Sequence, residues 1–147
     1  MADPITVQVA DVLSDEDLAA IERLLPQLSS TATFDRARVL SMLTHDGTDL
    51  IVARGDGRLV GMATLASFPL PTGVRGHLDD VVVAHELRGR GIARIMLEAV
   101  VELARARGMR TLDLTSRPSR ESAIRLYESV GFRRRDSMLM RYAGELG

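Results

Sequence analysis

The 147-residue sequence contains no cysteine and no tryptophan, and only 3% of its residues are aromatic. The absence of cysteine excludes disulfides, a thiolate nucleophile and cysteine-based metal sites, and it is typical of a reducing compartment. The low aromatic content argues against an aromatic cage for a bulky cation. Any catalysis must therefore come from other residue types.

The sequence also lacks an excess of either charge and any long hydrophobic run. Its 19 basic and 20 acidic residues give a formal net charge of −1, which provides no general attraction for nucleic acid or an anionic membrane. No run approaches the roughly 18 apolar residues of a membrane span, and the N-terminus has no apolar signal region. We expect a soluble, cytoplasmic protein with a single domain over residues 4–147 and neither nucleic acid nor membrane as a partner.

Hydrophobic periodicity predicts strands and helices along the whole chain. Strands are expected at 5–11, 49–54, 58–68, 77–83 and 111–116, and helices at 14–28, 34–45, 91–107 and 119–131, with Ser14 and Thr33 as N-caps of the first two. A closing pair of half-strands is expected within 132–142. The order β-α-α-β-β-β-α-β-α-β predicts an α/β (α+β) fold with a mixed, mostly antiparallel sheet of about six to seven strands flanked by four helices.

The stretch RGRGIAR, residues 88–94, opens the third expected helix with residues that destabilise a helix start. Basic residues there oppose the helix dipole by roughly 0.3–1 kcal/mol each, and a glycine inside a helix costs about 1 kcal/mol relative to alanine. A bound anion reverses both effects, because free N–H groups, close backbone approach and arginines together favour a pyrophosphate. The alternative is a solvated turn whose glycines serve a sharp bend.

Two common nucleotide motifs do not account for this stretch. The P-loop pattern G-x-x-x-x-G-K-[ST] is absent, which argues against an ordinary NTPase. Gly89 and Gly91 fit the start of the dinucleotide fingerprint G-x-G-x-x-G/A, but Arg94 replaces its third small residue. Only one further strand-helix unit follows, which leaves no room for a doubly wound sheet.

Two motifs resemble those of the GNAT N-acetyltransferases. Residues 88–93 are similar to the acetyl-CoA motif [QR]-x-x-G-x-[GA], and residues 123–132 resemble the family segment A-x-x-x-Y-x-x-x-G-F. The expected element order is also that of the family. The resemblance implies transfer of an acetyl group from acetyl-CoA to a primary amine by direct attack in a ternary complex, without a metal. It favours a small-molecule acceptor over a protein and is compatible with a homodimer.

The resemblance also assigns the donor site residue by residue. The strands at 77–83 and 111–116 are expected to splay apart, and the backbone of Val81, Val82 and Val83 to pair with the pantetheine arm. A backbone N–H near Val82 or Val83 is the implied oxyanion donor. The pyrophosphate is expected on the turn and helix start formed by Arg88, Gly89, Arg90, Gly91, Ile92, Ala93 and Arg94.

Tyr127 matches the tyrosine that serves the family as general acid toward the CoA thiolate. A phenol, with a pKa of about 10, is a weaker acid than a thiol with a pKa of about 8.5. Full proton transfer and hydrogen-bond donation to the thiolate therefore both stay open. The structural alternative is a half-buried tyrosine that packs under the sheet.

Asp79, Asp80 and His77 are the candidates for the base that deprotonates the acceptor amine. Strict alternation places one set of side chains on one face, His77, Asp79, Val81 and Val83, and another set on the opposite face, Leu78, Asp80 and Val82. An interior strand would thus bury at least one carboxylate, which raises a carboxylate pKa toward a useful range. Alternatively, one aspartate pairs with Arg75 or a helix arginine.

Several points of the resemblance are left open. Many family members carry asparagine where this chain has Arg120, and Arg117, Arg120 and the run Arg133 to Arg135 are either ligand contacts or solvated residues. Residues 76–83 also resemble the G-H-[IV]-E-D-[IV]-x-V strand of glucosamine-6-phosphate N-acetyltransferases, with Asp79 in place of the glutamate. Amino-sugar phosphate is therefore one acceptor hypothesis. The rival functions are a non-catalytic acyl-CoA-binding regulatory module and, more remotely, a nucleotide-dependent oxidoreductase.

Overall fold

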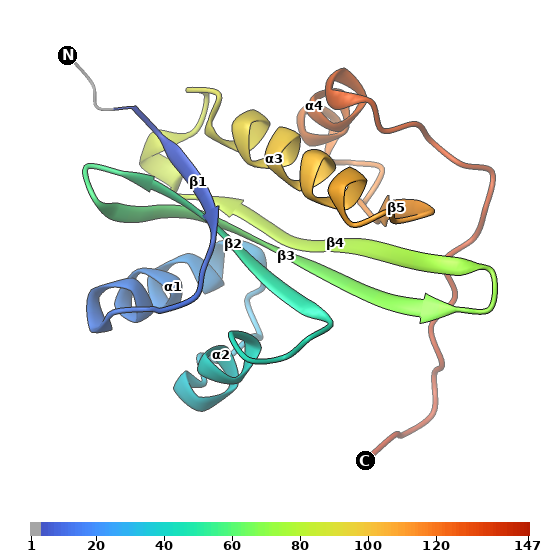
Figure 1. Ribbon diagram of the computed structural model, residues 1–147, viewed down its shortest axis with the longest axis horizontal. Helices are drawn as coiled ribbons and strands as arrows, with labels where there is room; N and C mark the ends of the chain where they lie inside the picture. The colour runs from blue at the N-terminus through green and yellow to red at the C-terminus, as the bar shows by residue number, and fades with distance from the viewer. Residues whose placement is uncertain (1–3) are drawn as a thin grey trace.

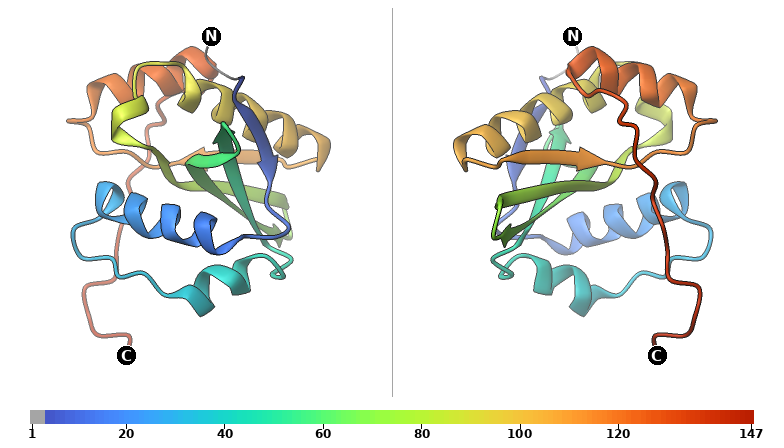
Figure 2. Two further views of the ribbon diagram at one scale, coloured as in Figure 1. Left: turned by 90° about the vertical axis from the view of Figure 1, so that its left-hand side faces the viewer. Right: turned by 90° about the vertical axis from the view of Figure 1, so that its right-hand side faces the viewer.

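The computed structural model describes residues 4–147 as one sheet with helices on both faces. The strands are β1 (Thr6–Val9), β2 (Thr48–Gly55), β3 (Arg58–Leu70), β4 (Gly73–Val83) and β5 (Thr111–Leu114). The helices are α1 (Asp15–Leu28), α2 (Arg36–Met42), α3 (Ile92–Ala106) and α4 (Glu121–Val130), with a 3-10 turn at His85–Leu87 (Figure 1). Figure 2 shows α1 and α2 on one face of the sheet and α3 and α4 on the other.

The sheet has the order β1-β2-β3-β4-β5, with β5 parallel to β4 and all other pairs antiparallel. The expected mixed, mostly antiparallel sheet and its four helices are confirmed. The expected strand count is not, because residues 132–142 form no strand. The segment instead leaves α4 and runs past the sheet without joining it (Figures 1 and 2). A local pattern predicts strand tendency but cannot encode whether a free sheet edge lies within reach.

Each face of the sheet buries its own hydrophobic core. Leu50 and Val52 of β2 pack in the first core, under α1 and α2, whereas Ile51 and Ala53 pack in the second, under α3 and α4. This follows from the two-residue period of a strand. Because both faces are covered, β2 reads as a continuous apolar run rather than as an alternating one. Val52 and Ala53 are fully buried.

The first two helices begin with side-chain caps. The expected Ser14 cap of α1 is confirmed: the Ser14 hydroxyl accepts from the Asp17 N–H at 3.0 Å, and the Asp17 carboxylate accepts from the Ser14 N–H at 3.0 Å. The expected Thr33 cap of α2 is wrong, since Asp35 occupies that position and accepts from the Arg38 N–H. Aspartate caps at least as well as threonine, so residue preference could not separate the two.

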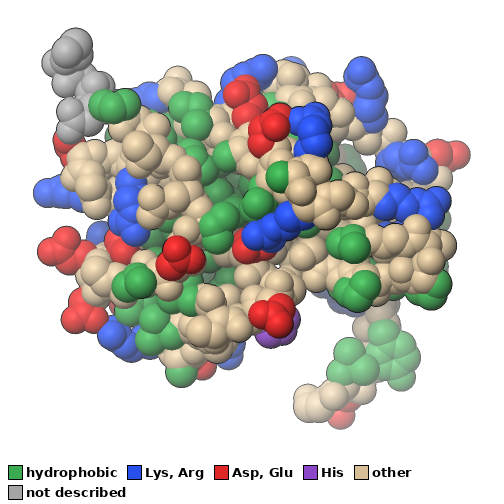
Figure 3. Space-filling view, viewed as in Figure 1, with side chains coloured by type: hydrophobic (Ala, Val, Ile, Leu, Met, Phe, Trp, Pro, Cys, Tyr) green, Lys and Arg blue, Asp and Glu red, His purple; other side chains and the backbone are tan. Residues whose placement is uncertain are grey.

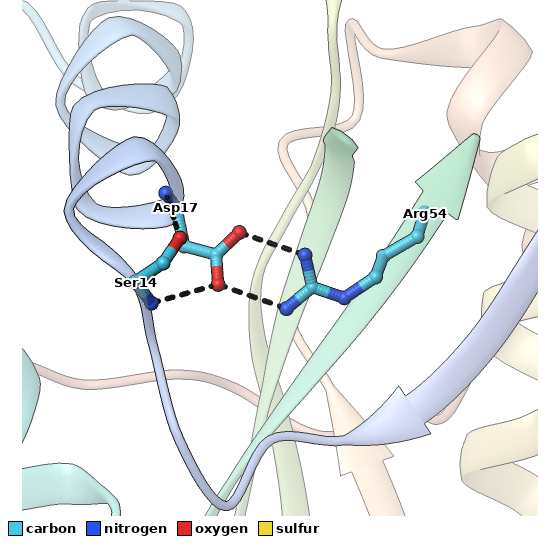
Figure 4. A network of polar contacts seen from close by, with 3 residues as sticks. All are labelled: Ser14, Asp17 and Arg54. Carbon is cyan, nitrogen blue, oxygen red and sulfur yellow. Dashed lines mark hydrogen bonds and ion pairs between the residues drawn. The ribbon is translucent and has the colours of Figure 1, made fainter. Parts of the chain in front are cut away.

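Asp17 also joins α1 to the sheet. The Arg54 guanidinium at the end of β2 donates to both carboxylate oxygens, Nη1 to Oδ1 at 2.7 Å and Nη2 to Oδ2 at 2.9 Å (Figure 4). Only 9% of the Asp17 side chain and 18% of the Arg54 side chain are exposed. The hydrogen bond from Arg54, helped by the Ser14 N–H, holds the pKa of Asp17 below its ordinary value of 3.8 against the opposing effect of burial.

We predict that Asp17→Asn lowers the free energy of unfolding at neutral pH by about 3 kcal/mol, because it leaves the Arg54 charge largely buried without a partner. The pKa of Asp17 is lowered on folding, so this contribution is complete above about pH 4 and is lost as pH falls through the folded pKa. Denaturant titrations at several pH values measure both effects. Asp15→Asn is the control, since Asp15 pairs with Arg36 on the surface and its loss changes stability by less than about 1 kcal/mol.

Candidate active site

A β-bulge interrupts the centre of β4. One residue of β3, Ala63, faces two residues of β4, Asp80 and Val81. Asp80 has a left-handed backbone with φ of 52°, and its N–H donates to Oδ1 of Asp79 at 2.9 Å. Aspartate is among the few residues besides glycine that tolerate this conformation. The two adjacent aspartates therefore supply both the unusual backbone and the hydrogen bond that accompanies it.

The bulge reverses the alternation of side chains along β4. Leu78 lies in the core under α3 and α4, and Val82 lies in the core under α1 and α2. Val83 lies again in the core under α3 and α4. The expectation that Leu78 and Val82 share a face is wrong, because the extra residue of a bulge shifts every later side chain to the other face. The expectation that the strand buries a carboxylate is wrong as well, since Asp79 and Asp80 are both exposed.

The pairing between β4 and β5 ends halfway along β4. β5 is paired with Arg75 to Leu78, and within the described residues no strand pairs with that side of β4 from Asp79 to Val83. Backbone groups of Val81, Val82 and Val83 on this side can therefore bind an extended ligand, as strands do when they pair with a peptide or another chain. This unpaired side of β4, from Asp79 to Val83, is the gap between β4 and β5.

The start of α3 differs from the starts of α1 and α2. Its N-cap is Gly91, with φ of 81° and no side-chain cap, and its first turn contains no acidic residue. Gly89 also has a positive φ, 78°, and a Cβ at either glycine would meet no atom within 4 Å. Backbone conformation, not crowding, therefore requires glycine. The first N–H groups of the helix, at Ile92, Ala93 and Arg94, have no partner four residues earlier, which fits a pyrophosphate.

The three arginines of this segment are placed differently. The Arg88 guanidinium donates to the Gln27 side chain of α1 at 3.1 Å. Arg94 donates from Nη1 to the Ser129 hydroxyl at 2.7 Å and pairs through Nε with Glu98 at 3.0 Å, so that it links α3 to α4. Arg90 is exposed between the two glycines. A phosphate contact of these side chains stays a prediction, and Arg90 can make one without giving up a described contact.

Tyr127 lies on α4 with its ring in the core under α3 and α4. The residue is 8% exposed, and its ring packs edge to face against Phe132 with centroids 6.2 Å apart. Within residues 4–147 its hydroxyl makes no hydrogen bond, yet no fully buried side-chain oxygen there lacks a partner. The hydroxyl must therefore reach solvent. The ring packs in the core, as the structural alternative predicts, and the role of the hydroxyl in the reaction stays a prediction.

The candidate bases His77, Asp79 and Asp80 lie close together on β4. The Asp79 carboxylate is 3.9 Å from Nε2 of half-buried His77, and His77 stands opposite Asp113 in the register of β4 and β5. Although Asp80 as a residue is exposed, partial desolvation of its carboxyl group, and next the charge and hydrogen bond of Asp79, raise its pKa above the ordinary value of 3.8. Within the described residues neither carboxylate pairs with an arginine.

The other arginines that the sequence singles out lie on the surface. Arg134 pairs with Glu128 at 3.7 Å, while Arg117 and Arg120 are exposed around the start of α4. Between residues 4 and 147 no group of three or more histidines and carboxylates is arranged to hold a metal ion. No helix in that range is long and apolar enough to cross a membrane.

A cleft of about 780 Å³ lies between α1, the β2–β3 turn and residues 84–87. It is lined by side chains of both charges, including Arg23, Arg58 and Glu86. None of the residues expected in the donor or catalytic sites lines it. The predicted site residues lie instead on β4, on the segment that leads into α3, at the start of α3 and on α4.

Sequence patterns do not establish three features of the site, although two of these features leave a local signal in the sequence. The bulge gave one faint signal, a pair of aspartates in the middle of an otherwise apolar strand. The contact of Arg94 with Ser129 depends on how α3 and α4 pack, and no local pattern indicates it. His77 and Asp79 lie two residues apart along a strand, a spacing from which a shared face could be inferred.

The chain matches the profile of the Acetyltransferase (GNAT) family over residues 13–132. It is 32% identical over 130 residues to the glucosamine 6-phosphate N-acetyltransferase of Trypanosoma brucei brucei, an alignment that covers 83% of this chain and 86% of that enzyme.

Solved structures share the fold. A putative acetyltransferase from Agrobacterium tumefaciens superposes with a TM-score of 0.82 at 23% identity, over 93% of this chain and 99% of that one. An aminoglycoside N-acetyltransferase solved in complex with CoA superposes with a TM-score of 0.80 at 17% identity, over 97% and 95% of the two chains. At these identities the likeness establishes the architecture and not the acceptor.

Proposed function

Because the chain belongs to the acetyltransferase (GNAT) family and is an N-acetyltransferase, we propose that it transfers the acetyl group of acetyl-CoA to a primary amine on a small amino sugar. The observation that carries this proposal is the unpaired half of β4, which is followed, after a 3-10 turn and the glycine turn at residues 88–91, by the uncapped start of α3. It offers a backbone edge for an extended arm and a run of N–H groups for a diphosphate.

The donor site is proposed along this path. The backbone of Val81, Val82 and Val83 pairs with the pantetheine arm, and the N–H groups that follow Gly91 bind the pyrophosphate. Arg88 and Arg90 flank this anion site. Acetyl-CoA supplies the activated acetyl group as a thioester. A backbone N–H of Val82 or Val83 donates to the thioester oxygen, on which negative charge develops during the reaction.

The catalytic groups are proposed on the two sides of the gap. Asp80, whose pKa is raised by partial desolvation and by Asp79, takes the proton of the acceptor ammonium, directly or through water. The amine nitrogen then forms its bond to the acetyl carbon as the carbon–sulfur bond breaks, and the second proton that the nitrogen loses passes through water to the CoA thiolate, which leaves as the thiol. Tyr127 donates its hydroxyl hydrogen bond to the sulfur that leaves. Its ring is held by the core, so the hydroxyl is positioned before the donor binds.

The polar face beside Asp79 supports an amino sugar as acceptor. Arg75, His77, Asp79 and Asp113 share the face of the sheet that α1 and α2 cover only in part, and all but His77 are exposed. This set offers hydrogen bonds for hydroxyl groups, carboxylates for an ammonium and a guanidinium for a phosphate. The relative at 32% identity is named as a glucosamine 6-phosphate N-acetyltransferase, which supports an amino sugar as the acceptor class.

We predict that the protein releases CoA thiol from acetyl-CoA when an amino sugar or amino-sugar phosphate is added. The chain has no cysteine, so a thiol reagent detects released CoA without a background from the protein. The panel should include glucosamine 6-phosphate, glucosamine, an aminoglycoside, a polyamine and a peptide with a free N-terminus. Turnover only with the peptide would contradict the proposed acceptor, and binding of acetyl-CoA without turnover on any amine would contradict the activity.

A pair of glycine variants provides the control for the donor site. Gly57 in the β2–β3 turn and Gly91 both have positive φ, 73° and 81°, and open space around a new Cβ. Gly57→Ala and Gly91→Ala therefore introduce a similar strain of about 1–2 kcal/mol. Only Gly91→Ala should raise the KM for acetyl-CoA. Equal effects of the two variants on that KM would show that α3 does not bind the donor.

We predict that Tyr127→Phe lowers kcat at least several-fold and leaves the melting temperature unchanged. The hydroxyl contributes no described hydrogen bond to the fold, and phenylalanine preserves the packing against Phe132. Steady-state kinetics with the best acceptor and a thermal melt measure the two effects. Unchanged kinetics would remove Tyr127 from the reaction and leave it a packing residue.

Asp79 and Asp80 are predicted to affect the pH dependence in different ways. Asp80→Asn should lower kcat by about 100-fold, the lower range for loss of a general base, and abolish the acidic limb of the pH–rate profile. Asp79→Asn should move that limb to lower pH, because it removes a charge that raises the pKa of Asp80. If both variants keep the wild-type profile, neither residue is the base.

Asp80→Asn, which should lower kcat, is predicted to raise the stability of the fold. Because the pKa of Asp80 is raised on folding, its ionisation destabilises the fold as pH rises above about 4 and through the folded pKa. Asparagine tolerates the left-handed backbone and carries no charge. Asp80→Asn should therefore increase the free energy of unfolding at neutral pH, and the gain should vanish at low pH. A loss of stability at neutral pH would contradict the raised pKa.

A further inference from the structure

Helix α4 carries Tyr127 but is held by few buried residues. Within the described structure Tyr127 is the only buried residue of Glu121–Val130, and no side chain caps the start of the helix. The half-buried apolar residues of α4 pack against α3, where Met96 and Leu97 are fully buried. The position of the Tyr127 hydroxyl therefore depends strongly on how α4 is attached to α3.

Arg94 of α3 fastens the last turn of α4. Its Nη1 donates to Oγ of Ser129 at 2.7 Å, and that hydroxyl donates its own hydrogen to the carbonyl oxygen of Leu126 at 2.6 Å. Nε of Arg94 pairs with Glu98, one turn further along α3, at 3.0 Å. Among the residues that the structure describes, Arg94 makes the only side-chain hydrogen bonds between α4 and another helix or strand.

This contact accounts for an arginine at a helix start, where its charge opposes the helix dipole. The last turn of α4 contains no basic residue of its own, although a cation stabilises the negative end of a helix dipole. Arg94 belongs to the first turn of α3 but brings its guanidinium to this end of α4, where Nη2 lies 3.5 Å from the carbonyl oxygen of Ser129. The charge that is unfavourable for α3 is therefore favourable for α4.

The surroundings of Arg94 favour this contact over a contact with phosphate. Acidic and basic side chains lie next to each other over the region of α3 and α4 in Figure 3. Arg94 is already paired with Glu98 and hydrogen-bonded to Ser129, whereas Arg90 is exposed. A phosphate bound at the start of α3 can therefore contact Arg90 while Arg94 stays on α4.

We propose that Arg94 is a positioning residue: through Ser129 it holds α4, and with it the Tyr127 hydroxyl, against the helix start that binds the pyrophosphate. The inference rests on the proposed function, which assigns the roles of Tyr127 and of the α3 start. Arg94 does not contact the reacting atoms and acts through Tyr127. Loss of its contact therefore lowers kcat by no more than loss of the Tyr127 hydroxyl does.

Amide hydrogen exchange and calorimetric binding of CoA test the contact without turnover. Ser129→Ala removes the acceptor and keeps the charge of Arg94, so it should speed exchange in α4 while exchange in α3 and the Kd for CoA stay unchanged. Ser122→Ala is the matched control, because Ser122 is an exposed serine of the same helix. Exchange in α4 that is no faster in Ser129→Ala than in Ser122→Ala would overturn the proposal.

A pair of arginine variants separates a link between helices from a phosphate ligand. Arg94→Gln and Arg90→Gln each remove one positive charge from the same segment. Arg94→Gln should speed exchange in α4, whereas Arg90→Gln should leave α4 unchanged and raise the Kd for CoA by the larger factor. A larger rise in that Kd with Arg94→Gln would identify Arg94 as a phosphate ligand and overturn the proposal.

Steady-state kinetics with the best acceptor test whether the contact acts through Tyr127. Ser129→Ala should lower kcat by up to about tenfold, the effect of one net hydrogen bond, and leave the KM for acetyl-CoA unchanged. In the Tyr127→Phe background it should have no further effect, because the group that it positions is gone. An unchanged kcat, or an equal fall in both backgrounds, would overturn the positioning role.

Failure of the proposed function gives a different result. If Tyr127→Phe alone leaves kcat unchanged, Tyr127 is not the group that assists the departing thiolate. Faster exchange in α4 of Ser129→Ala would then show that Arg94 links the two helices structurally, and its positioning role in the reaction would be overturned.

Discussion

The structure depends on one constraint on β4: the strand packs on both faces, while its backbone beyond Leu78 is unpaired on the β5 side. Its side chains enter the core under α1 and α2 and the core under α3 and α4, so each residue is committed to one face by its position. The bulge at Asp80 exchanges the two faces for every later side chain of the strand. Because of it, Val82 and Val83 fill the correct cores while two carboxylates lie at the surface, where the pairing with β5 has just ended.

The helix starts show how the same fold separates stability from function. At α1 the Ser14 hydroxyl accepts from the free N–H of Asp17, and the ion pair of Asp17 with Arg54 holds that end of the helix on β2 (Figure 4). At α3 a glycine replaces the cap, and the acids of the first turn are missing. The α3 helix therefore relies on its apolar face, which includes the fully buried Met96, Leu97 and Val100. Burial of roughly 1.5–3 kcal/mol per large side chain holds a helix whose first turn is left for a ligand.

Local sequence signals were sufficient wherever neighbouring residues decide the structure. Periodicity located the helices and the first five strands, the Ser14 cap followed from residue type, and the glycines around Arg90 marked the start of α3. Local sequence signals were not sufficient where a residue's conformation or contact depends on an element distant in the chain. The reversal of faces after Asp80, the Arg54 pair of Asp17 and the contact of Arg94 with Ser129 each depend on an element far away in the chain. The closing pair of half-strands predicted within 132–142 does not form, because a strand-like local pattern does not determine whether the segment meets a sheet edge.

The bulge also determines how this protein can change during evolution. Exchanging one β-branched residue for another at Val82 alters packing by little more than a methyl group, and cores absorb changes of that size. Deleting or inserting one residue between Leu78 and Val82 would instead move the valines that follow into the wrong layers. The number of residues in this part of β4 therefore determines which face each later side chain occupies. Length should be inherited here more strictly than residue identity, and an alignment gap within these five positions would indicate a different site.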